Sequence, residues 1–562
     1  MTKKIDDRQP KGIEADQPVP SRRTLLEGLG LSGLLAAVPS ASDAKARRLR
    51  ASSKGVDQAF KAAIDTIVII YAENRSFNNL FPDFPGLSHP LNALKPEHYL
   101  QRDRDGRILE TLPPIWGGLA PDPQVVNHQT YQIAEADLTG LANKPFALAT
   151  ANGDPLPQGV VTRDLVHAFY QSQMQINGGL NDRFVAWGDS GAMVMGHYGD
   201  NPVNMRLWRI ARDYTLCDNF FMGSFGGSFL AHQYLVAARP PFYPDAANSP
   251  AKGLLSELEG DDPLGTRLKT LSSSPGSARD GRPRFGPTVL TPDFFAVNTM
   301  NPPYQPGATR SPADPDLADP LDAKTMPPQR HATIGDRLTA KDVDWAWYAG
   351  GWQAALDQRA GATLDTGPEF AKRPNFQPHH QPFNYFAQFA PGTAERARHL
   401  RDGGVEDSPR TNRFLADIEA GKLPPVVFYK PQGNFNMHAG YSDIEAGDRH
   451  IATIVSALQS GPQWGRMAIV IAFDENGGWW DHVPPPKGDR WGPGTRIPAI
   501  VVSPHAKRGK VDHTLYDTGS IARLIIRRFG LETLPGLTER EHAMRAAGGI
   551  APGDLMDAFD FG

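Results

Sequence analysis

The sequence contains a single cysteine, Cys217, among 562 residues. One thiol cannot form an intrachain disulfide, and it cannot supply the cysteine cluster that a zinc or iron–sulfur site of that type needs. A buried, unreactive thiol is the simplest interpretation of this residue. We therefore expect neither a disulfide-stabilised fold nor a cysteine-ligated metal centre.

An excess of positive charge is also missing. Lys and Arg total 58 against 62 Asp and Glu, which gives a net charge of −4. Because no basic field covers the chain, nucleic acid is not expected as a partner. The 40% hydrophobic and 21% charged residues are ordinary for a globular protein and exclude a disordered, collagenous or coiled-coil chain. No apolar run beyond roughly the first ~45 residues is long enough to cross a bilayer, so no stable membrane span is expected.

A short apolar run near the N-terminus follows a pair of arginines. Residues 21–26 read SRRTLL, the apolar run extends to Val38, and small residues occupy most of 40–46. This layout is typical of a twin-arginine export signal, and the run is short for an ordinary membrane span. An amphipathic helix is the alternative. We predict that residues 1–46 are a signal peptide read by the twin-arginine export machinery, and that the mature protein is periplasmic or secreted.

The elements of a layered fold are visible in the mature chain. Apolar runs rich in β-branched residues predict buried strands at 66–71, 426–429, 467–473 and 497–502. Because these runs are continuous rather than alternating, the sheet should be covered on both faces. Helical patterns follow, notably at 450–458 and 520–529. The alternation predicts an α/β fold, with an α/β/α sandwich around a mostly parallel central sheet.

Long stretches between these elements are dense in Pro, Gly, Ser and Asp, notably 240–287 and 302–328. They lack the periodic apolar content of an independent core, so we interpret them as loop-rich insertions. The expected organisation is a single domain over residues 47–562, with insertions around 85–165 and 240–330.

Two of the predicted strands end in acidic residues. Glu73 and Asn74 follow the first strand, and Asp474 and Glu475 follow the third. Ligands of open α/β sheets bind beyond the carboxyl ends of the strands, and adjacent buried acids repel each other unless a cation or protons neutralise them. Oxygen donors with no thiol nearby suit Mg²⁺, Mn²⁺ or Ca²⁺, while the available histidines leave Zn²⁺ open. A turn with a capping role is the alternative for the first pair.

A serine follows two glycines in Gly226-Gly227-Ser228, where a predicted helix begins and continues to Ala238. Glycines let a ligand approach the backbone, and a helix N-terminus favours anions, so Ser228 is a candidate nucleophile that faces a phosphate. The alternative is a plain N-cap serine.

Several histidines stand in contexts that suggest a cluster, although a single loop histidine is usually a surface residue. They are His167, the adjacent His379 and His380, and His438 in the stretch GNFNMHAGYSD. Histidines that gather around a phosphate can donate hydrogen bonds to its oxygens and protons to a leaving group.

Taken in order, these segments resemble a bacterial phosphoesterase family that contains phospholipases C and the AcpA-type acid phosphatases, within the wider alkaline phosphatase-like superfamily. The motifs that carry the resemblance span the mature chain almost end to end. They are Glu73–Phe77, Gln173–Gly179, Gly227–Phe229, His438–Asp443, Gly447–Ile451, Asp474–Gly478, Pro498–Pro504, Gly553–Leu555 and Ala558–Phe561.

The resemblance implies an alkaline phosphatase-like fold and a phosphoester hydrolase that acts on a phosphorylated small molecule or lipid. It implies one divalent metal ion, held by Glu73, Asn74, Ser228, Asp474 and Glu475. It places His167, His379 or His380, and His438 around the phosphate. We expect Ser228 to attack phosphorus and form a phosphoserine, and His438 to protonate the leaving alkoxide. A protonated histidine with an ordinary pKa near ~6.5 would give an acidic optimum.

The sequence departs from its relatives at two places. Asn78 stands where many relatives carry an acid, and Gly226-Gly227-Ser228 replaces a threonine-centred motif with a Pro-Asn-Arg sequence that is typical of the phospholipase C branch. The second departure favours the acid phosphatase branch. We therefore predict an exported, metal-dependent acid phosphatase that cleaves phosphomonoesters. The alternatives are a phospholipase C-type phosphodiesterase and a non-catalytic phosphoester-binding protein.

Overall fold

A computed structural model describes residues 54–307, 309–357, 376–405 and 412–562. The predicted signal peptide, residues 1–46, lies outside the described residues. Val56–Gly562 forms one compact unit. Every helix within the described ranges is too short or too polar to cross a bilayer.

An eight-stranded sheet forms the centre of this unit, in the order β13-β6-β12-β11-β1-β10-β8-β9. The strands are β1 (Thr66–Ala72), β6 (Thr215–Cys217), β8 (Trp345–Gly350), β9 (Leu400–Gly404), β10 (Val426–Lys430), β11 (Met467–Phe473), β12 (Ala499–Val502) and β13 (Lys510–Asp512). β12 pairs antiparallel with β11 and β6, and the other pairs are parallel. The mostly parallel sheet and its four predicted strands are confirmed, although β12 begins at Ala499 rather than at 497.

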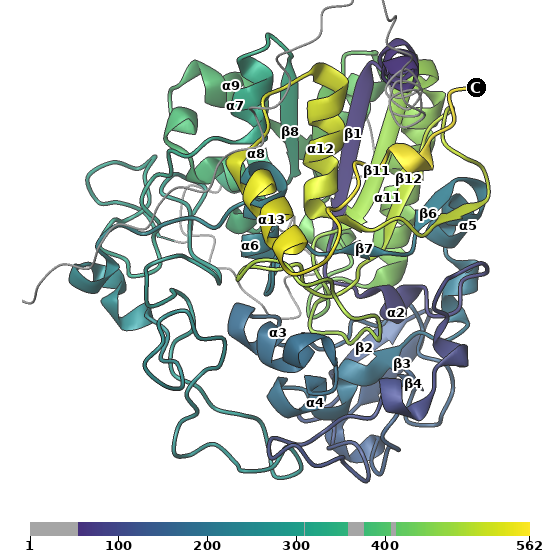
Figure 1. Cartoon of the computed structure of the whole chain (residues 1–562), viewed down its shortest axis with the longest axis vertical. Helices are drawn as coiled ribbons and strands as arrows, with labels where there is room; N and C mark the ends of the chain where they lie inside the picture. The colour runs from purple at the N-terminus through teal and green to yellow at the C-terminus, as the bar shows by residue number, and fades with distance from the viewer. Residues whose placement is uncertain (1–53, 308, 358–375, 406–411) are drawn as a thin grey trace, which may run out of the picture. The chain divides into compact units, whose positions relative to one another are not determined.

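Helices cover both faces of the sheet (Figure 1). On one face, the Tyr71 hydroxyl of β1 donates a hydrogen bond to the carbonyl of Ala231 at 3.4 Å, in α6 (Ser228–Ala237), which contacts α12 (Thr518–Phe529). On the other face, Tyr348 and Tyr429 pack on Phe414 of α10 (Arg413–Glu419). α10 contacts α11 (Ile444–Ser460), which in turn contacts α5 (Arg206–Asp213). The predicted α/β/α sandwich is therefore confirmed.

The other labelled helices and strands vary in length, and several of these helices contact the central sheet. The helices are α2 (Phe77–Leu80), α3 (Phe169–Ile176), α4 (Phe184–Trp187), α7 (Ile334–Thr339), α8 (Trp352–Asp357), α9 (Ala394–His399) and α13 (Pro535–Ala546). The strands form three pairs: β2 (Ala120–Val126) with β3 (Gln129–Ile133), β4 (Phe146–Ala147) with β5 (Gly196–His197), and β7 (Phe220–Phe221) with β14 (Tyr516–Asp517).

The two predicted insertions contact each other. Between 240 and 330 the described residues form short 3₁₀ helices and isolated bridges. Arg104, in the first insertion, donates hydrogen bonds to the carbonyls of Ser277 at 3.0 Å and Gly281 at 2.7 Å in the second. Asp103 accepts from the backbone N–H of Ala278 at 2.7 Å. Side-chain to backbone hydrogen bonds thus hold together segments that have little regular structure of their own.

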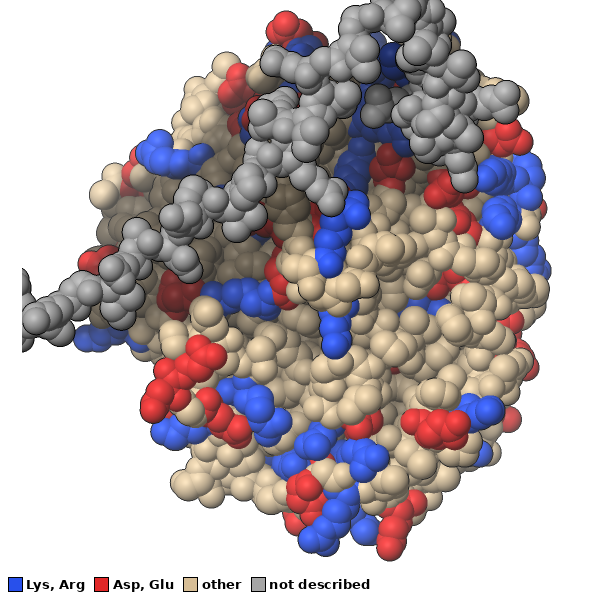
Figure 2. Space-filling model, in the orientation of Figure 1, with Lys and Arg blue, Asp and Glu red and all other residues tan. Residues whose placement is uncertain are grey.

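Charges of both signs share the face drawn in Figure 2. Much of this face carries no charged residue, Lys and Arg lie near Asp and Glu in several places, and no continuous basic area covers the described residues on this face. This distribution agrees with the small net charge of −4.

A buried ion pair connects three parts of the chain. Arg496, before β12, contacts both carboxylate oxygens of Asp481 at 3.1 and 3.2 Å, and both side chains have no exposed surface. Arg496 also donates to the Asn78 side-chain oxygen at 3.2 Å. An acid at position 78 would add a second carboxylate to this buried site, so the amide here is explained by the hydrogen bond that it accepts.

Replacing Arg496 by Met should lower the free energy of unfolding by about 3–5 kcal/mol, because Asp481 would lose its buried partner. Urea unfolding at neutral pH measures this. The matched control is Arg466→Met, which breaks the ion pair with Asp65, in which both side chains are about half exposed. The free energy of unfolding of Arg466→Met should fall much less, since exposed ion pairs contribute little to stability. Equal losses in the two variants would contradict a special role for the buried pair.

Candidate active site

The register of two neighbouring strands brings the predicted acidic residues together. β1 and β11 are parallel, and Ala72 lies opposite Phe473 at their ends. The next residues in each strand are therefore side by side, and the backbone N–H of Asn74 donates to Asp474 Oδ1 at 3.0 Å. Glu73, Asn74, Asp474 and Glu475 are all fully buried. The carboxyl end of the sheet thus holds three carboxylates and an amide in a small volume.

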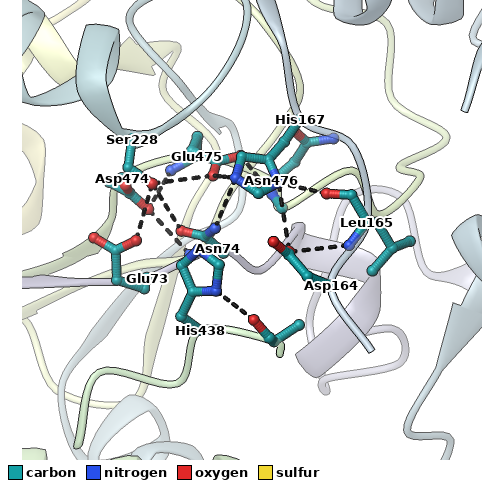
Figure 3. A network of polar contacts seen from close by, with 12 residues as sticks. Glu73, Asn74, Asp164, Leu165, His167, Ser228, His438, Asp474, Glu475 and Asn476 are labelled. Atoms are coloured by element: carbon teal, nitrogen blue, oxygen red, sulfur yellow. Dashed lines mark hydrogen bonds and ion pairs between the residues drawn. The ribbon is translucent and has the colours of Figure 1, made fainter. Parts of the chain in front are cut away.

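Ser228 faces this group from the first turn of α6. Its hydroxyl oxygen lies 3.0 Å from Glu73 Oε2, 3.2 Å from Asn74 Oδ1 and 3.4 Å from Glu475 Oε1 (Figure 3). The helix is capped by Gly227, so the alternative of a plain N-cap serine is wrong. A single hydroxyl hydrogen satisfies only one of these acceptors at a time, which leaves an oxygen-rich centre.

The two glycines before Ser228 are explained by a close approach of backbone. A Cβ atom on Gly227 would lie 2.6 Å from the carbonyl oxygen of His167, and Gly226 has a φ of +96°. The segment that carries His167 therefore passes directly against the turn into α6. This contact places the imidazole beside the serine.

The residues at this centre fit a hard divalent cation. Burial, reinforced by the charge of Asp474, raises the pKa of Glu73 to about 8, and burial raises the pKa of Glu475 well above its usual range. Asp474 Oδ2 has no hydrogen-bond partner among the described residues. Buried carboxylates whose charge is only partly compensated are stabilised by a cation, and Glu73, Asn74, Ser228, Asp474 and Glu475 offer the oxygen donors that Mg²⁺, Mn²⁺ or Ca²⁺ prefer.

His167 and His438 lie beside this centre in different electrostatic environments (Figure 3). Although burial lowers the pKa of His167, the carboxylates of Glu475 and Asp164 raise it to about 9. Its Nε2 atom is 3.7 Å from Glu475 Oε1. Burial, together with the nearby charge of His167, lowers the pKa of His438 well below its ordinary value. The carboxylates beside His167 therefore favour its protonated form more than the surroundings of His438 do.

A cavity of about 480 Å³ opens at Ser228, and its walls include His167, His379, His438 and Tyr441. His380 does not line it. The His380 ring turns away, is almost fully buried, and places Nε2 3.3 Å from Glu73 Oε1. Of the adjacent histidines, which the sequence did not distinguish, His379 faces the cavity and His380 faces the carboxylate.

Sequence reasoning missed two buried residues of this centre, Lys430 and His232. The Lys430 ammonium contacts Glu73 Oε1, and His232 Nδ1 lies 2.7 Å from the carbonyl oxygen of Ser228. Both had a signal in the sequence. Lys430 ends a strand of otherwise apolar residues next to β1, and His232 stands one helical turn after Ser228.

Comparisons with known families and curated proteins agree with one another. The model of the Phosphoesterase family matches residues 64–532. A non-hemolytic phospholipase C of Pseudomonas aeruginosa is 29% identical over 177 residues, which cover 26% of this chain and 24% of that protein. Phospholipase C B of Mycobacterium tuberculosis is 30% identical over 26% of this chain and 32% of its own length. Non-specific phospholipase C1 of Arabidopsis thaliana is 30% identical over 22% and 28%. The chain thus spans less than a third of the length of these relatives.

Similarity to solved structures is much weaker. A protein of the alkaline phosphatase superfamily from Vibrio parahaemolyticus is 7% identical, with a TM-score of 0.30 over 69% of this chain and 72% of that one. A similarity of this size does not extend to the positions of individual residues.

Replacing Asp474 by Asn should weaken the binding of a divalent ion by at least about tenfold, because the amide removes a charged oxygen donor from the centre. Calorimetric titration of the purified protein with Mn²⁺ measures the affinity. Glu419→Gln, an exposed change at the end of α10, is the control and should bind as the parent does. Unchanged affinity in Asp474→Asn would remove Asp474 from the ligand set.

Proposed function

The chain belongs to the phosphoesterase family, as its motifs predicted, and we propose that it is an exported, metal-dependent hydrolase that cleaves phosphomonoesters. One observation carries this proposal. The hydroxyl of Ser228 lies within 3.4 Å of Glu73, Asn74 and Glu475 and lines a cavity of about 480 Å³. A nucleophile, an oxygen-rich cation site and room for a small ligand therefore occur at one point.

Ser228 is the proposed nucleophile. Glu73, Asn74, Ser228, Asp474 and Glu475 would hold one divalent ion, which when bound lowers the pKa of the serine hydroxyl and offsets charge on the phosphoryl oxygens. Ser228 Oγ forms a bond to phosphorus while the bond from phosphorus to the leaving oxygen breaks. The nearest acceptor for the hydroxyl proton is Glu73 Oε2, at 3.0 Å.

His167 is the proposed proton donor to the leaving alkoxide. The sequence analysis expected His438 in this role. The raised pKa of His167 and the lowered pKa of His438 favour His167 instead. Water then attacks the phosphoserine while the bond from phosphorus to Ser228 Oγ breaks. His167 takes up a proton from that water, Glu73 returns its proton to Ser228 Oγ at 3.0 Å, and phosphate leaves. His379 and His438 line the same cavity and can orient the phosphoryl oxygens through hydrogen bonds.

A phospholipase C-type phosphodiesterase is the second candidate, because the curated relatives described above are phospholipases C. The Gly-Gly-Ser motif instead supports the hypothesis that the protein cleaves phosphomonoesters. A non-catalytic phosphoester-binding protein is a third candidate, although a binding protein needs no serine among the ligands of a cation. The twin-arginine pattern within residues 1–46 supports the proposal that the protein is exported to the periplasm or beyond the cell.

The proposal predicts that the purified protein hydrolyses p-nitrophenyl phosphate faster than p-nitrophenyl phosphorylcholine, and that chelation abolishes both rates. Absorbance of released p-nitrophenol, followed before and after addition of EDTA and then of Mn²⁺ or Mg²⁺, measures this. A faster rate on the phosphorylcholine ester would assign the protein to the phosphodiesterase candidate. Hydrolysis of neither ester would favour the binding protein.

The control for that experiment is Ser228→Ala, which should reduce hydrolysis by roughly 10⁴-fold or more, since the covalent step is lost. Ser460→Ala, an exposed serine at the end of α11, should hydrolyse as the parent does. Substantial turnover by a folded Ser228→Ala protein would refute the nucleophile.

The rate should fall as pH rises through the pKa of His167, because the proton donor is then lost. The raised pKa moves this fall above the ordinary range of histidine and so opposes the acidic optimum expected from the sequence. His167→Gln should be slower by about 10²–10⁴-fold and should lack the alkaline fall. Profiles of kcat against pH for the two proteins measure this. If the fall disappears in His438→Gln instead, His438 is the donor.

A further inference from the structure

The two oxygens of Glu73 face different surroundings. Oε2 points to the Ser228 hydroxyl at 3.0 Å. Oε1 points away from the serine, toward the Lys430 ammonium, with His380 Nε2 at 3.3 Å and His232 Nε2 at 3.9 Å. Only the contact of Oε2 with Ser228 belongs to the cation site described above.

Glu73 Oε1, His232 and His380 together have the composition of a metal site. Glu73 Oε1 and the ligating nitrogens of His232 and His380 come from three separate segments, and the three atoms lie within 4.8 Å of one another. One carboxylate oxygen and two imidazole nitrogens at this spacing are a familiar ligand set for a divalent transition metal.

The two imidazole nitrogens are available as ligands. Both residues are at most 3% exposed, and neither Nε2 atom has a hydrogen-bond partner among the described residues. His232 Nδ1 lies 2.7 Å from the Ser228 carbonyl oxygen, so Nδ1 carries the proton and Nε2 presents a lone pair. The two rings stack with centroids 4.9 Å apart, which holds them in place.

Lys430 supplies a positive charge beside Glu73 Oε1 and the two histidines. It is the last residue of β10 and is 1% exposed. Its ammonium contacts Glu73 Oε1 and lies 5.3 Å from the centre of the Tyr71 ring, which also favours a cation. An ammonium is placed in the protein interior only where partners compensate its charge, and here Glu73 is such a partner.

We propose that the Lys430 ammonium occupies the second cation position of a centre that would otherwise hold two metal ions. The protein then binds one divalent ion, on the serine side of Glu73. Glu73, His232 and His380 form a latent site that accepts a second ion once Lys430 is removed. In two-metal phosphoesterases both charges are metal ions about 3.5–4 Å apart, whereas here a covalently attached ammonium replaces one of them. This inference rests on the proposed cation site at Ser228.

Metal content tests the inference without any substrate. The full-length protein, Lys430→Met and Lys430→Arg are each equilibrated with Mn²⁺ or with Zn²⁺, passed through a desalting column and analysed by plasma mass spectrometry. We expect about one equivalent per chain in the parent and in Lys430→Arg, and about two in Lys430→Met. His232→Gln added to Lys430→Met should return the content to about one.

Lys422→Met, at an exposed position before β10, is the matched control and should keep about one equivalent. Circular dichroism establishes that each variant is folded. Two equivalents in the parent or in Lys430→Arg, or a single equivalent in folded Lys430→Met, would overturn the inference. If Lys430→Met does not fold, Lys430→Gln, which also removes the ammonium, replaces it with the same expected and contradicting outcomes.

The outcome is separable from the proposed function. One equivalent in the parent and two in Lys430→Met, together with no hydrolysis of either p-nitrophenyl ester, would refute the hydrolase and retain the role of Lys430. Hydrolysis of either ester by a parent protein that holds two equivalents of metal would support the hydrolase and refute the role of Lys430.

Discussion

Compensation of buried negative charge is the constraint on which this structure depends. Glu73, Asp474 and Glu475 are fully buried at the carboxyl ends of β1 and β11. Carboxylates in such a place are stable as anions only if cations or hydrogen-bond donors surround them. The nearby groups provide compensation of three kinds: backbone N–H groups toward Asp474, the ammonium of Lys430 toward Glu73, and the imidazole of His167 toward Glu475. The oxygens that face Ser228 are left for the proposed divalent ion.

The fold holds these groups in place through contacts far from any ligand. Parallel pairing of β1 with β11 sets the two acidic pairs side by side, and a helix that begins at Ser228 faces them because two glycines admit the backbone of 167–169. The loop after β11 is fixed by the buried pair of Asp481 and Arg496. A rigid surrounding structure of this kind lets a site keep unfavourable charges close together.

The histidines have different electrostatic surroundings, which suit them to different tasks. Proximity to Glu475 and Asp164 favours the protonated form of His167, while burial favours the neutral form of His438, His379 and His380. One charged and several neutral imidazoles around a phosphate can donate a proton, orient oxygens and flank the carboxylate as separate tasks. In the proposed hydrolase, Lys430 adds a fixed charge that requires no second metal ion.

The sequence by itself determined the layers of the fold and most of the chemistry. Continuous apolar runs predicted β1, β10, β11 and β12, and the residues after two of them predicted the oxygen-rich centre. It did not predict β8, although Trp and Tyr favour strands, because the prediction relied on runs rich in β-branched residues. It also missed the three-residue strands β6 and β13, since segments this short are recognised as strands only through their neighbours in the sheet. Only the tertiary structure decided which of two adjacent histidines faces the cavity, which imidazole lies beside carboxylates, and that Lys430 and His232 belong to the centre. Those properties depend on distances between segments that lie far apart along the chain, and local patterns carry no record of such distances.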